Sequence, residues 1–425
     1  MKILIISKYA FSKEVGFETR SFALSRIFVK KGHEVTIISS VDNYFGKFPA
    51  YKKNYNNQTI DGIKVTWVKT LNYTKTISLK RVVSWLDFEW KLLWLKKDLL
   101  NDPDVIIVSS LSLLSILNGV RLKKKFNCKL IFEIRDIWPL TLVEEGAYSP
   151  SNPLIKLLSR IERWGYKNSD LVVGTMPNIG EHVNNVTKMQ INCACVPFGF
   201  HLQDYNGKLL NNEDTNRYEI PSNKFVIGYA GSIGLSNGLD TFIEVIKRLK
   251  DNQDIHFVIL GGGGLCESYM KYLQECNNVQ FISRVERHEV KTILAKCNVL
   301  YFAALKSRVW NYGWSPNKLI DYMISGKPIL ASYSGFQSMV NEANSGIIVP
   351  AEDEESLIKA INKLLLMPKE ELEVMGEMGK QWLIQNRQWT TVADDYLSIM
   401  DDLLNPIKID NFQGMQSAPI LKETI

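Results

Sequence analysis

The stretch Lys2-Ile-Leu-Ile-Ile6 decides the fold of this chain, because an unbroken run of apolar residues of this length is typical of a buried parallel strand. A loop that contains Gly16 follows, and then a predicted helix over Thr19–Lys31. Gly32 ends that helix before a second apolar strand at Glu34–Ser39. This alternation predicts a parallel sheet covered by helices.

The same alternation continues along the chain and then starts again. Further strands of the first half are predicted at Lys64–Val68, Asp104–Val108, Lys129–Ile134, Leu171–Thr175 and Ile191–Val196. Strands of the second half are predicted at Lys224–Ala230, Ile255–Leu260, Val279–Ser283, Val299–Ala303, Pro328–Ala331 and Gly346–Val349. We therefore expect an α/β protein with two doubly wound Rossmann-like domains that face a cleft, where ligands bind at the carboxyl ends of the strands.

The domain limits follow from this pattern and from the polar connector at residues 203–224. We expect an N-terminal domain at 1–202 and a C-terminal domain at 203–385. A helix at 386–405 is expected to return to the first domain, and 406–425 form a polar tail.

Composition narrows the class of protein. The chain is 45% apolar and 23% charged, which excludes disordered, collagen-like and disulfide-scaffold proteins. Its net charge of +6 is too small an excess to predict a nucleic-acid partner. Six cysteines without metal-ligand spacing predict reduced thiols and no metal site. No stretch reaches the roughly 20 apolar residues of a membrane span, so we expect a cytoplasmic protein.

A nicotinamide-dependent enzyme is excluded by the glycine pattern. The first strand leads into a loop with no glycine before Gly16, and the run Gly261–Gly264 has Cys266 where the third glycine of a dinucleotide fingerprint belongs.

The segment Ser315-Pro-Asn-Lys-Leu-Ile-Asp321 predicts an anion site. Ser315 suits a helix N-cap and Pro316 the first helical position, so the amides of Asn317 and Lys318 open a helix that favours a phosphate. Asp321, one turn further along, can accept hydrogen bonds from two ribose hydroxyls. The alternative is a solvated Lys-Asp pair on an exposed helix.

Two glycine-bearing loops are candidates for close contact with the same ligand. Ser232, Gly234 and Asn237 lie in the loop Gly231–Gly238, which precedes a predicted helix at Leu239–Lys250. Gly16 lies in the opposing domain. The alternatives are a tight strand-helix turn without ligand and an ordinary loop glycine.

These segments resemble glycosyltransferase family 4 of the GT-B fold. Further matching pieces are Lys31-Gly-His-Glu-Val-Thr36, Arg135-Asp-Ile-Trp-Pro139, Ser169-Asp-Leu-Val-Val173 and Val196-Pro-Phe-Gly199, and the resemblance spans about residues 1–400. The similarity is greatest to the branch of N-acetyl-L-fucosamine transferases of O-antigen and capsule assembly. It implies a metal-independent, configuration-retaining transfer without a cofactor. The expected donor is a UDP-sugar, and the expected acceptor is a polyprenyl-diphosphate-linked saccharide.

The resemblance also implies that the N-terminal domain at 1–202 binds the acceptor and the C-terminal domain at 203–385 binds the nucleotide-sugar. It implies roles for single residues as well. It assigns catalysis to Lys318, Arg135 and Asp136, and binding of the acceptor to Arg20 and Arg135. It assigns binding of the donor to Gly16, Ser232, Gly234, Asn237, Arg284, Ser315, Asn317, Lys318 and Asp321. For Arg135 the alternative is a surface ion pair.

Three positions depart from the family pattern. Gly313 stands where the earlier glutamate of the usual pair belongs, and Ser232 and Asn237 stand where many relatives have Arg and Lys. Without a second carboxylate, retention argues for same-face, internal-return-like transfer rather than a covalent double displacement. A UDP-sugar 2-epimerase and a non-catalytic nucleotide-sugar-binding homologue remain alternatives.

The segment from Lys80 to Lys97 carries Trp85, Trp90 and Trp94 among leucines, with basic residues at both ends. This composition is typical of a helix that lies on an anionic membrane surface, and the resemblance implies a position on the inner face of the cell membrane. The alternative is a helix packed into the core of the first domain.

Overall fold

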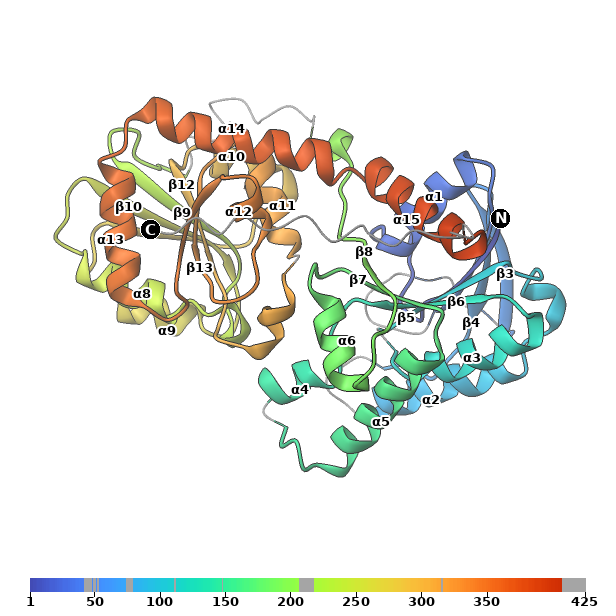
Figure 1. The fold of residues 1–425 in the computed structure, drawn as a ribbon. Helices are drawn as coiled ribbons and strands as arrows, with labels where there is room; N and C mark the ends of the chain where they lie inside the picture. The colour runs from blue at the N-terminus through green and yellow to red at the C-terminus, as the bar shows by residue number, and fades with distance from the viewer. Residues whose placement is uncertain are drawn as a thin grey trace, which may run out of the picture.

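The computed structural model describes residues 1–41, 48, 51, 53–73, 79–110, 112–146, 148–205, 218–314 and 316–406. These residues form two α/β domains that lie side by side (Figure 1). Much of the predicted connector and tail, residues 206–217 and 407–425, lies outside the described part, as does Ser315.

The first sheet has eight strands in the order β3-β4-β2-β1-β5-β6-β7-β8, and only the edge pair β3/β4 is antiparallel. The strands are β1 Lys2–Ile6, β2 Glu34–Ser40, β3 Tyr55–Ile60, β4 Ile63–Val68, β5 Val105–Ser109, β6 Lys129–Ile134, β7 Leu171–Gly174 and β8 Cys193–Cys195.

The second sheet has six parallel strands in the order β11-β10-β9-β12-β13-β14. They are β9 Phe225–Ser232, β10 Ile255–Gly262, β11 Val279–Ile282, β12 Val299–Ala303, β13 Ile329–Ser332 and β14 Gly346–Val349. In both sheets the strand order reverses direction beside the first strand of the domain. The expected fold of two doubly wound Rossmann-like domains is therefore confirmed.

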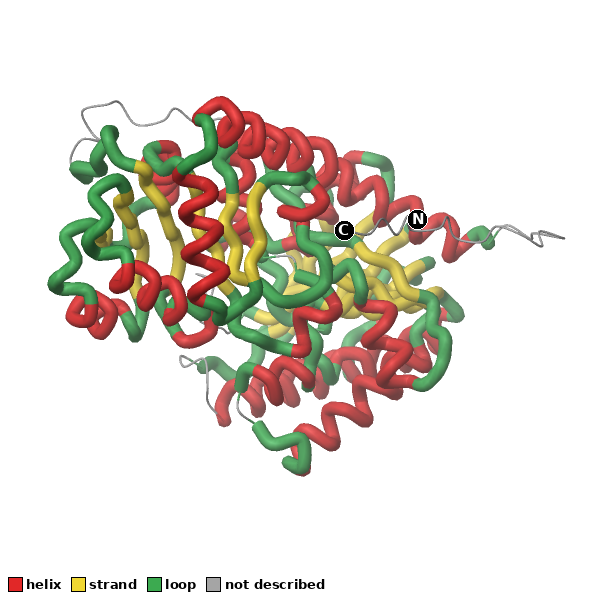
Figure 2. The backbone as a smooth tube through the Cα atoms, turned by 60° about the vertical axis from the view of Figure 1, so that its left-hand side comes forward, coloured by secondary structure: helices red, strands yellow, loops and turns green. Residues whose placement is uncertain are grey.

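Helices cover the sheets (Figure 2). The first domain contains α1 Arg20–Lys30, α2 Leu79–Leu93, α3 Ser115–Phe126, α4 Leu140–Glu144, α5 Pro153–Asn168 and α6 Ile179–Thr187. The second domain contains α8 Asp240–Arg248, α9 Cys266–Tyr272, α10 Arg287–Ala295, α11 Asn317–Ile324, α12 Met339–Glu342, α13 Glu354–Leu365 and α14 Lys369–Asn386. Single turns of 3-10 helix are η1 Lys13–Val15, η2 Lys97–Leu99, η3 Leu202–Asp204, η4 Leu235–Asn237 and η5 Arg308–Tyr312.

The last helix, α15 Trp389–Leu404, packs in the first domain although it follows the second in the chain. Trp389, Tyr396 and Met400 are buried in the same cluster as Phe22 and Phe28 of α1, on one face of the first sheet. The opposite face is covered by α2, α3, α5 and α6, whose buried side chains form a second cluster. The long helix α14 carries the chain from one domain to the other (Figure 1).

The ends of β9 and β10 differ from the prediction, and glycine explains why. Both strands run two residues further than expected, because Gly231 and Gly261 are paired neighbours whose backbones touch. A Cβ on Gly261, where φ is +147°, would overlap the carbonyl oxygen of Gly231. The glycine run that fails as a dinucleotide fingerprint thus serves close packing of two strand ends.

Two other elements differ from the prediction. The edge strand β3 was missed, because Tyr-Asn-Asn-Gln-Thr-Ile lacks apolar alternation and pairs only with β4. The helix predicted up to Lys250 ends at Arg248.

Met400 provides a test of where α15 belongs. We expect Met400→Ala to lower the free energy of unfolding by about 2–5 kcal/mol, because the side chain is fully buried in the first-domain cluster. Urea denaturation followed by tryptophan fluorescence measures this loss. Met378→Ala is the matched control, since Met378 on α14 is 44% exposed. Equal losses in the two variants would contradict the packing of α15.

Candidate active site

Three adjoining cavities lie along the cleft. A cavity of about 420 Å³ lies at the ends of β9 and β10, and a central cavity of about 640 Å³ lies between the domains. The first is called the nucleotide-side cavity below, because the sequence analysis expects the nucleotide there. A third, of about 340 Å³, lies between α4 and η5 and is called the η5 cavity below. Asp321 lines the first and second cavities, whereas Arg135 and Asn317 line the second and third. The predicted site residues therefore lie along one continuous path.

Lys318 on the first turn of α11 is the central cation of the nucleotide-side cavity. Its Nζ donates to Tyr229 Oη at 2.8 Å, lies 3.4 Å from Asn237 Oδ1, and sits 4.3 Å from the centre of the Tyr229 ring. Burial lowers the pKa of Lys318 to about 8. Among the described residues no carboxylate pairs with it, so the alternative of a solvated pair with Asp321 is wrong.

Gly231 leaves the space that the side chain of Lys318 occupies. A Cβ on Gly231 would lie 2.5 Å from both Cε and Nζ of Lys318, at a backbone φ of +156°. Only a glycine at the end of β9 lets the ammonium lie against the strand. The sequence predicted this loop as a ligand cradle, and the structure adds that it makes room for the lysine.

The remaining predicted donor residues divide into two groups. Ser232 and Arg284 line the nucleotide-side cavity with Asp321. Gly234 and Asn237 bound the single-turn helix η4, and Asn237 reaches the site through its contact with Lys318.

Asp321 accepts a hydrogen bond from the hydroxyl of Tyr205, a residue that the sequence did not single out. This bond fixes the carboxylate from outside the nucleotide-side cavity. The carboxylate is thereby held at the border between the nucleotide-side and central cavities.

The start of α11 differs from the prediction. The helix begins at Asn317, and Pro316 is its N-cap with an extended backbone, rather than its first helical residue. Ser315, the predicted N-cap, lies outside the described residues. The first amides of the helix still have no partner within the helix, and Asn317 lines both the central and the η5 cavities.

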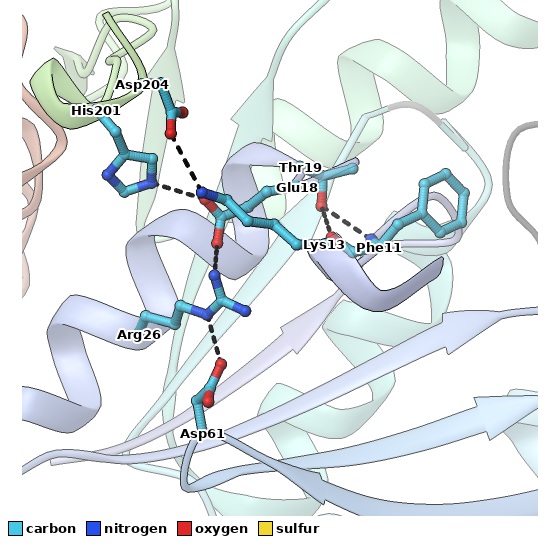
Figure 3. Close-up of polar contacts among 8 residues, drawn as sticks. All are labelled: Phe11, Lys13, Glu18, Thr19, Arg26, Asp61, His201 and Asp204. Atoms are coloured by element: carbon cyan, nitrogen blue, oxygen red, sulfur yellow. Dashed lines mark hydrogen bonds and ion pairs between the residues drawn. The ribbon is translucent and has the colours of Figure 1, made fainter. Parts of the chain in front are cut away.

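Gly16 lines the central cavity from the first domain, at a φ of +139°. The loop around it is closed by Thr19, whose Oγ1 accepts from Phe11 N at 2.9 Å and donates to Phe11 O at 3.1 Å (Figure 3). A glycine is thus held at the one position where the loop needs a positive φ.

Glu18, next to this loop, links three parts of the chain. It pairs with Arg26 of α1 and accepts from His201 Nε2 at 2.7 Å, while Lys13 reaches Asp204 at 3.5 Å (Figure 3). These contacts tie the Gly16 loop to residues 201–204, where the chain leaves the first domain. No sequence motif indicated this network.

Arg20 lines the central cavity, and its contact with the acceptor stays a prediction. Its guanidinium is fully buried: Nε pairs with Glu133 at 3.1 Å, and its terminal nitrogens donate to Val196 O at 2.8 Å and Pro197 O at 2.5 Å. Arg20 therefore positions the segment after β8, and these contacts use three of the five N–H donors of its guanidinium.

Arg135 and Asp136 follow β6 and line the η5 cavity. The Arg135 guanidinium lies 5.1 Å from the centre of the Phe198 ring, and among the described residues its buried Nε has no hydrogen-bond partner. The alternative of a surface ion pair is therefore wrong. Burial raises the pKa of the Asp136 carboxyl.

Glu145 faces the same cavity and was missed by the sequence analysis. Burial, followed by the charges of Asp136 and Glu144, raises its pKa. Trp310 and Trp314 line the opposite wall. Two carboxyls and aromatic rings around a small cavity suit a polyhydroxylated ring.

The surroundings of Gly313 explain why this chain lacks the glutamate that the family usually has at this position. The φ of Gly313 is +101°, and a Cβ would overlap Pro177 Cδ of the first domain. Nearby, Arg308 Nε and Nη2 donate to Glu144 at 2.9 and 2.7 Å, and Asn178 N donates to Tyr312 O at 3.0 Å. The η5 segment is thus clamped onto the first domain, with no space for a longer side chain at 313.

In the part of the chain that the structure describes, no group of three or more His, Cys, Asp or Glu side chains is arranged to hold an ion.

Comparison with known proteins gives matches to both domains. The family described as Glycosyltransferase Family 4 matches residues 16–200, and the family described as Glycosyl transferases group 1 matches residues 211–382. WbjE of Pseudomonas aeruginosa, named as a glycosyltransferase, is 24% identical over 319 residues, which are 72% of this chain and 76% of WbjE. WcaI of Escherichia coli K12, named as a colanic acid biosynthesis glycosyl transferase, is 29% identical over 36% of this chain and 39% of its own length.

Among solved structures, Anabaena Alr3699/HepE in complex with UDP has the same fold. The TM-score is 0.65 at 14% identity, over 95% of this chain and 100% of that chain.

The protein is therefore a glycosyltransferase with the GT-B fold. It combines a family 4 domain with a group 1 domain, and its relatives include proteins named for polysaccharide biosynthesis.

The buried charge of Lys318 makes a stability prediction with a definite sign. Because the folded pKa of about 8 lies below the ordinary 10.5, protonated Lys318 destabilises the folded state below pH 8. We expect Lys318→Met to raise the free energy of unfolding at pH 7 by about 1–3 kcal/mol. This gain should shrink as the pH rises from 8 to 10.5. Urea unfolding at several pH values measures it, and a gain independent of pH would contradict the burial of the charge.

Gly313 gives a second prediction. We expect Gly313→Ala to destabilise the protein by roughly 1–3 kcal/mol, because the new Cβ meets Pro177 and alanine disfavours this φ. Gly264→Ala is the control, since no atom lies within 4 Å of a Cβ there. Thermal unfolding compares them, and an unchanged midpoint for Gly313→Ala would refute the close contact.

Proposed function

We propose that this glycosyltransferase transfers a sugar from a UDP-sugar to a polyprenyl-diphosphate-linked saccharide during surface polysaccharide assembly, with retention of configuration and without a metal ion or cofactor. The observation that carries the proposal is Lys318, a half-buried ammonium without a carboxylate partner beside a helix start and a glycine loop. Such a group is stabilised by a bound anion, and a diphosphate supplies one. The UDP complex of Anabaena HepE supports this choice of nucleotide.

The chemistry follows from the order of the cavities. The ribose lies at Asp321, the diphosphate between Lys318 and the first amides of α11, and the sugar towards the η5 cavity. When the bond between the sugar C1 and the β-phosphate oxygen breaks, Lys318 and the helix amides stabilise the leaving diphosphate. An acceptor hydroxyl bonds to C1 on the same face, and its proton passes to the leaving phosphate oxygen.

The remaining catalytic candidates fit the sugar side of this arrangement. Arg135 and Asp136 border the η5 cavity, where the Arg135 guanidinium can bind the acceptor and the Asp136 carboxyl a sugar hydroxyl. Gly313 leaves only Asp321 of the family's usual acidic pair, so no second carboxylate on that segment forms a covalent intermediate. The retaining route through direct transfer is therefore the one we propose.

A lipid-linked acceptor places the enzyme at a membrane surface. No helix in the described residues is long and apolar enough to cross a bilayer, and we propose peripheral association with the inner face of the cell membrane. We further propose that the acceptor and sugar belong to O-antigen or capsule assembly, as in the branch of N-acetyl-L-fucosamine transferases.

Nucleotide binding tests the donor site. We expect UDP to raise the unfolding midpoint by several degrees, since ligand at one hundred times its dissociation constant adds about 2.7 kcal/mol. The shift should be the same with and without magnesium, and smaller with GDP, ADP, TDP and CDP. No shift with any nucleotide would overturn the proposal in favour of a protein without a functional donor site.

The role of Lys318 is tested by turnover. We expect Lys318→Ala to lower the rate of sugar transfer to a lipid extract by about tenfold to a thousandfold, as for loss of one charge-stabilising donor. Lys271→Ala, on the exposed side of α9, should leave the rate unchanged. A parental rate for Lys318→Ala would contradict its role, and epimerisation of free UDP-sugar without transfer would favour the 2-epimerase.

A further inference from the structure

The outer surface of α2, α3 and α5 is unusually apolar. These helices lie on one face of the first sheet, with α3 in contact with both of the others. Ten of the twenty-one large apolar side chains that are exposed among the described residues lie on them or directly after α2. They are Val82, Val83, Leu86, Trp90, Leu93, Trp94, Leu117, Leu154, Leu157 and Trp164. We call this surface the three-helix face.

The tryptophans of α2 divide between the two sides of the helix. Trp85 turns inward, where Nε1 donates to Tyr9 Oη at 2.7 Å and the ring meets Trp138 edge-on. Its assignment to a membrane surface is therefore wrong. Trp90 and Trp94 turn outward with exposed fractions of 61% and 67%, and their rings contact each other at 6.0 Å. The same helix buries Phe88 and Leu92, so the interpretation as a core helix is confirmed for its inner side.

The charges on the three-helix face have one sign. All seven exposed charged side chains of the described parts of α2, α3 and α5 are basic. They are Lys80, Lys124, Lys125, Lys156, Arg160, Arg163 and Lys167. Four of them lie on α5 beside Leu157 and Trp164, so apolar and basic side chains are interleaved on one helix.

The acidic side chains of these helices form hydrogen bonds with other residues of the protein. Asp87 accepts from Lys91 and from Leu71 N, both at 2.9 Å. Glu89 accepts from Asn118 Nδ2 at 2.8 Å and from two serines. Glu162 contacts His182 Nε2 at 2.8 Å and Tyr166 Oη at 3.0 Å. Negative charge is therefore removed from the outer surface, although the sequences of α2 and α5 contain it.

We infer that the three-helix face docks on an anionic lipid bilayer, with Trp90, Trp94 and Trp164 in the interface and the basic side chains against lipid phosphates. Exposed apolar patches of this extent mark interaction sites, and the uniform positive charge matches an anionic surface. The inference rests on the proposed function for its lipid-linked acceptor, and it extends the contact from one tryptophan-rich helix to three helices.

The position of the η5 cavity agrees with this orientation. Thr141 on α4 and Glu145 directly after it line that cavity, and α5 begins at Pro153, eight residues after Glu145. The segment that borders the candidate sugar site thus leads directly into the docking surface. A saccharide attached to a membrane lipid can approach the cavity from that side.

Vesicle binding tests the three-helix face. The full chain is sedimented with vesicles of phosphatidylcholine alone and of phosphatidylcholine mixed with phosphatidylglycerol, at low and high salt. We expect binding to the anionic vesicles that weakens with salt, because surface charges are screened. The triple variant Lys156→Gln/Arg160→Gln/Lys167→Gln should lose on the order of a hundredfold in affinity, at roughly fivefold per basic side chain. Trp90→Ser/Trp94→Ser should lose binding at both salt concentrations.

A matched control separates position from total charge. Lys359→Gln/Lys363→Gln/Lys369→Gln removes three exposed charges from the second domain and should bind like the parent. Equal losses in both triple variants, or unchanged binding of the tryptophan variant, would overturn the proposal. So would a tryptophan variant that changes the oligomeric state without affecting vesicle binding, since a second copy would then cover this face.

The same variants keep this inference separate from the proposed function. All substituted residues lie outside the three cavities, so the midpoint shift with UDP should be retained in each variant. Loss of vesicle binding with an intact UDP shift supports the docking surface. An intact UDP shift without vesicle binding by the parent chain overturns the docking surface alone.

Discussion

The ammonium of Lys318, packed on the ring of Tyr229 and unpaired with any carboxylate among the described residues, is the constraint on which the donor site depends. Its burial requires glycine at 231, a backbone contact between two strand ends, and a helix that starts directly over them. The partly buried, unpaired ammonium costs stability in the free protein. In the function that we propose, a bound diphosphate offsets this cost, because it supplies the missing negative charge.

The sequence predicted the fold well, because buried parallel strands are unbroken apolar runs and glycines mark their ends. It also predicted most residues of the cleft, since these follow strands whose carboxyl ends meet at one edge. It could not show which contacts a polar side chain makes within the protein. Arg20 has the chemistry of a ligand-binding group, but only tertiary packing shows that Glu133 and two carbonyls accept three of its N–H groups.

The missed residues lacked a local signal. Tyr205, Glu18 and Glu145 enter the cleft because distant segments meet there, and nothing in their neighbouring sequence distinguishes them from surface residues. Trp85 and Trp90 show the same limit within one helix. Their apolar stripe is wider than one helix face, and the sequence does not indicate that Trp85 turns inward while Trp90 turns outward. Gly313, by contrast, departs from the family pattern for a reason that the structure shows, since only a residue without Cβ permits the close contact with Pro177.

The position of α15 has a consequence for how the chain folds during synthesis. The first domain emerges from the ribosome first, yet Trp389, Tyr396 and Met400 of its core are among the last residues described. The part of the sheet face that α15 covers, beside α1, thus stays open until the whole second domain has been translated. The second domain, whose sheet and helices are continuous in sequence, can complete its own core earlier. The cores of the two domains are therefore completed in the reverse of the order in which the domains are translated. The apolar surface that is exposed in the meantime is prone to aggregation and is the kind of surface that chaperones bind.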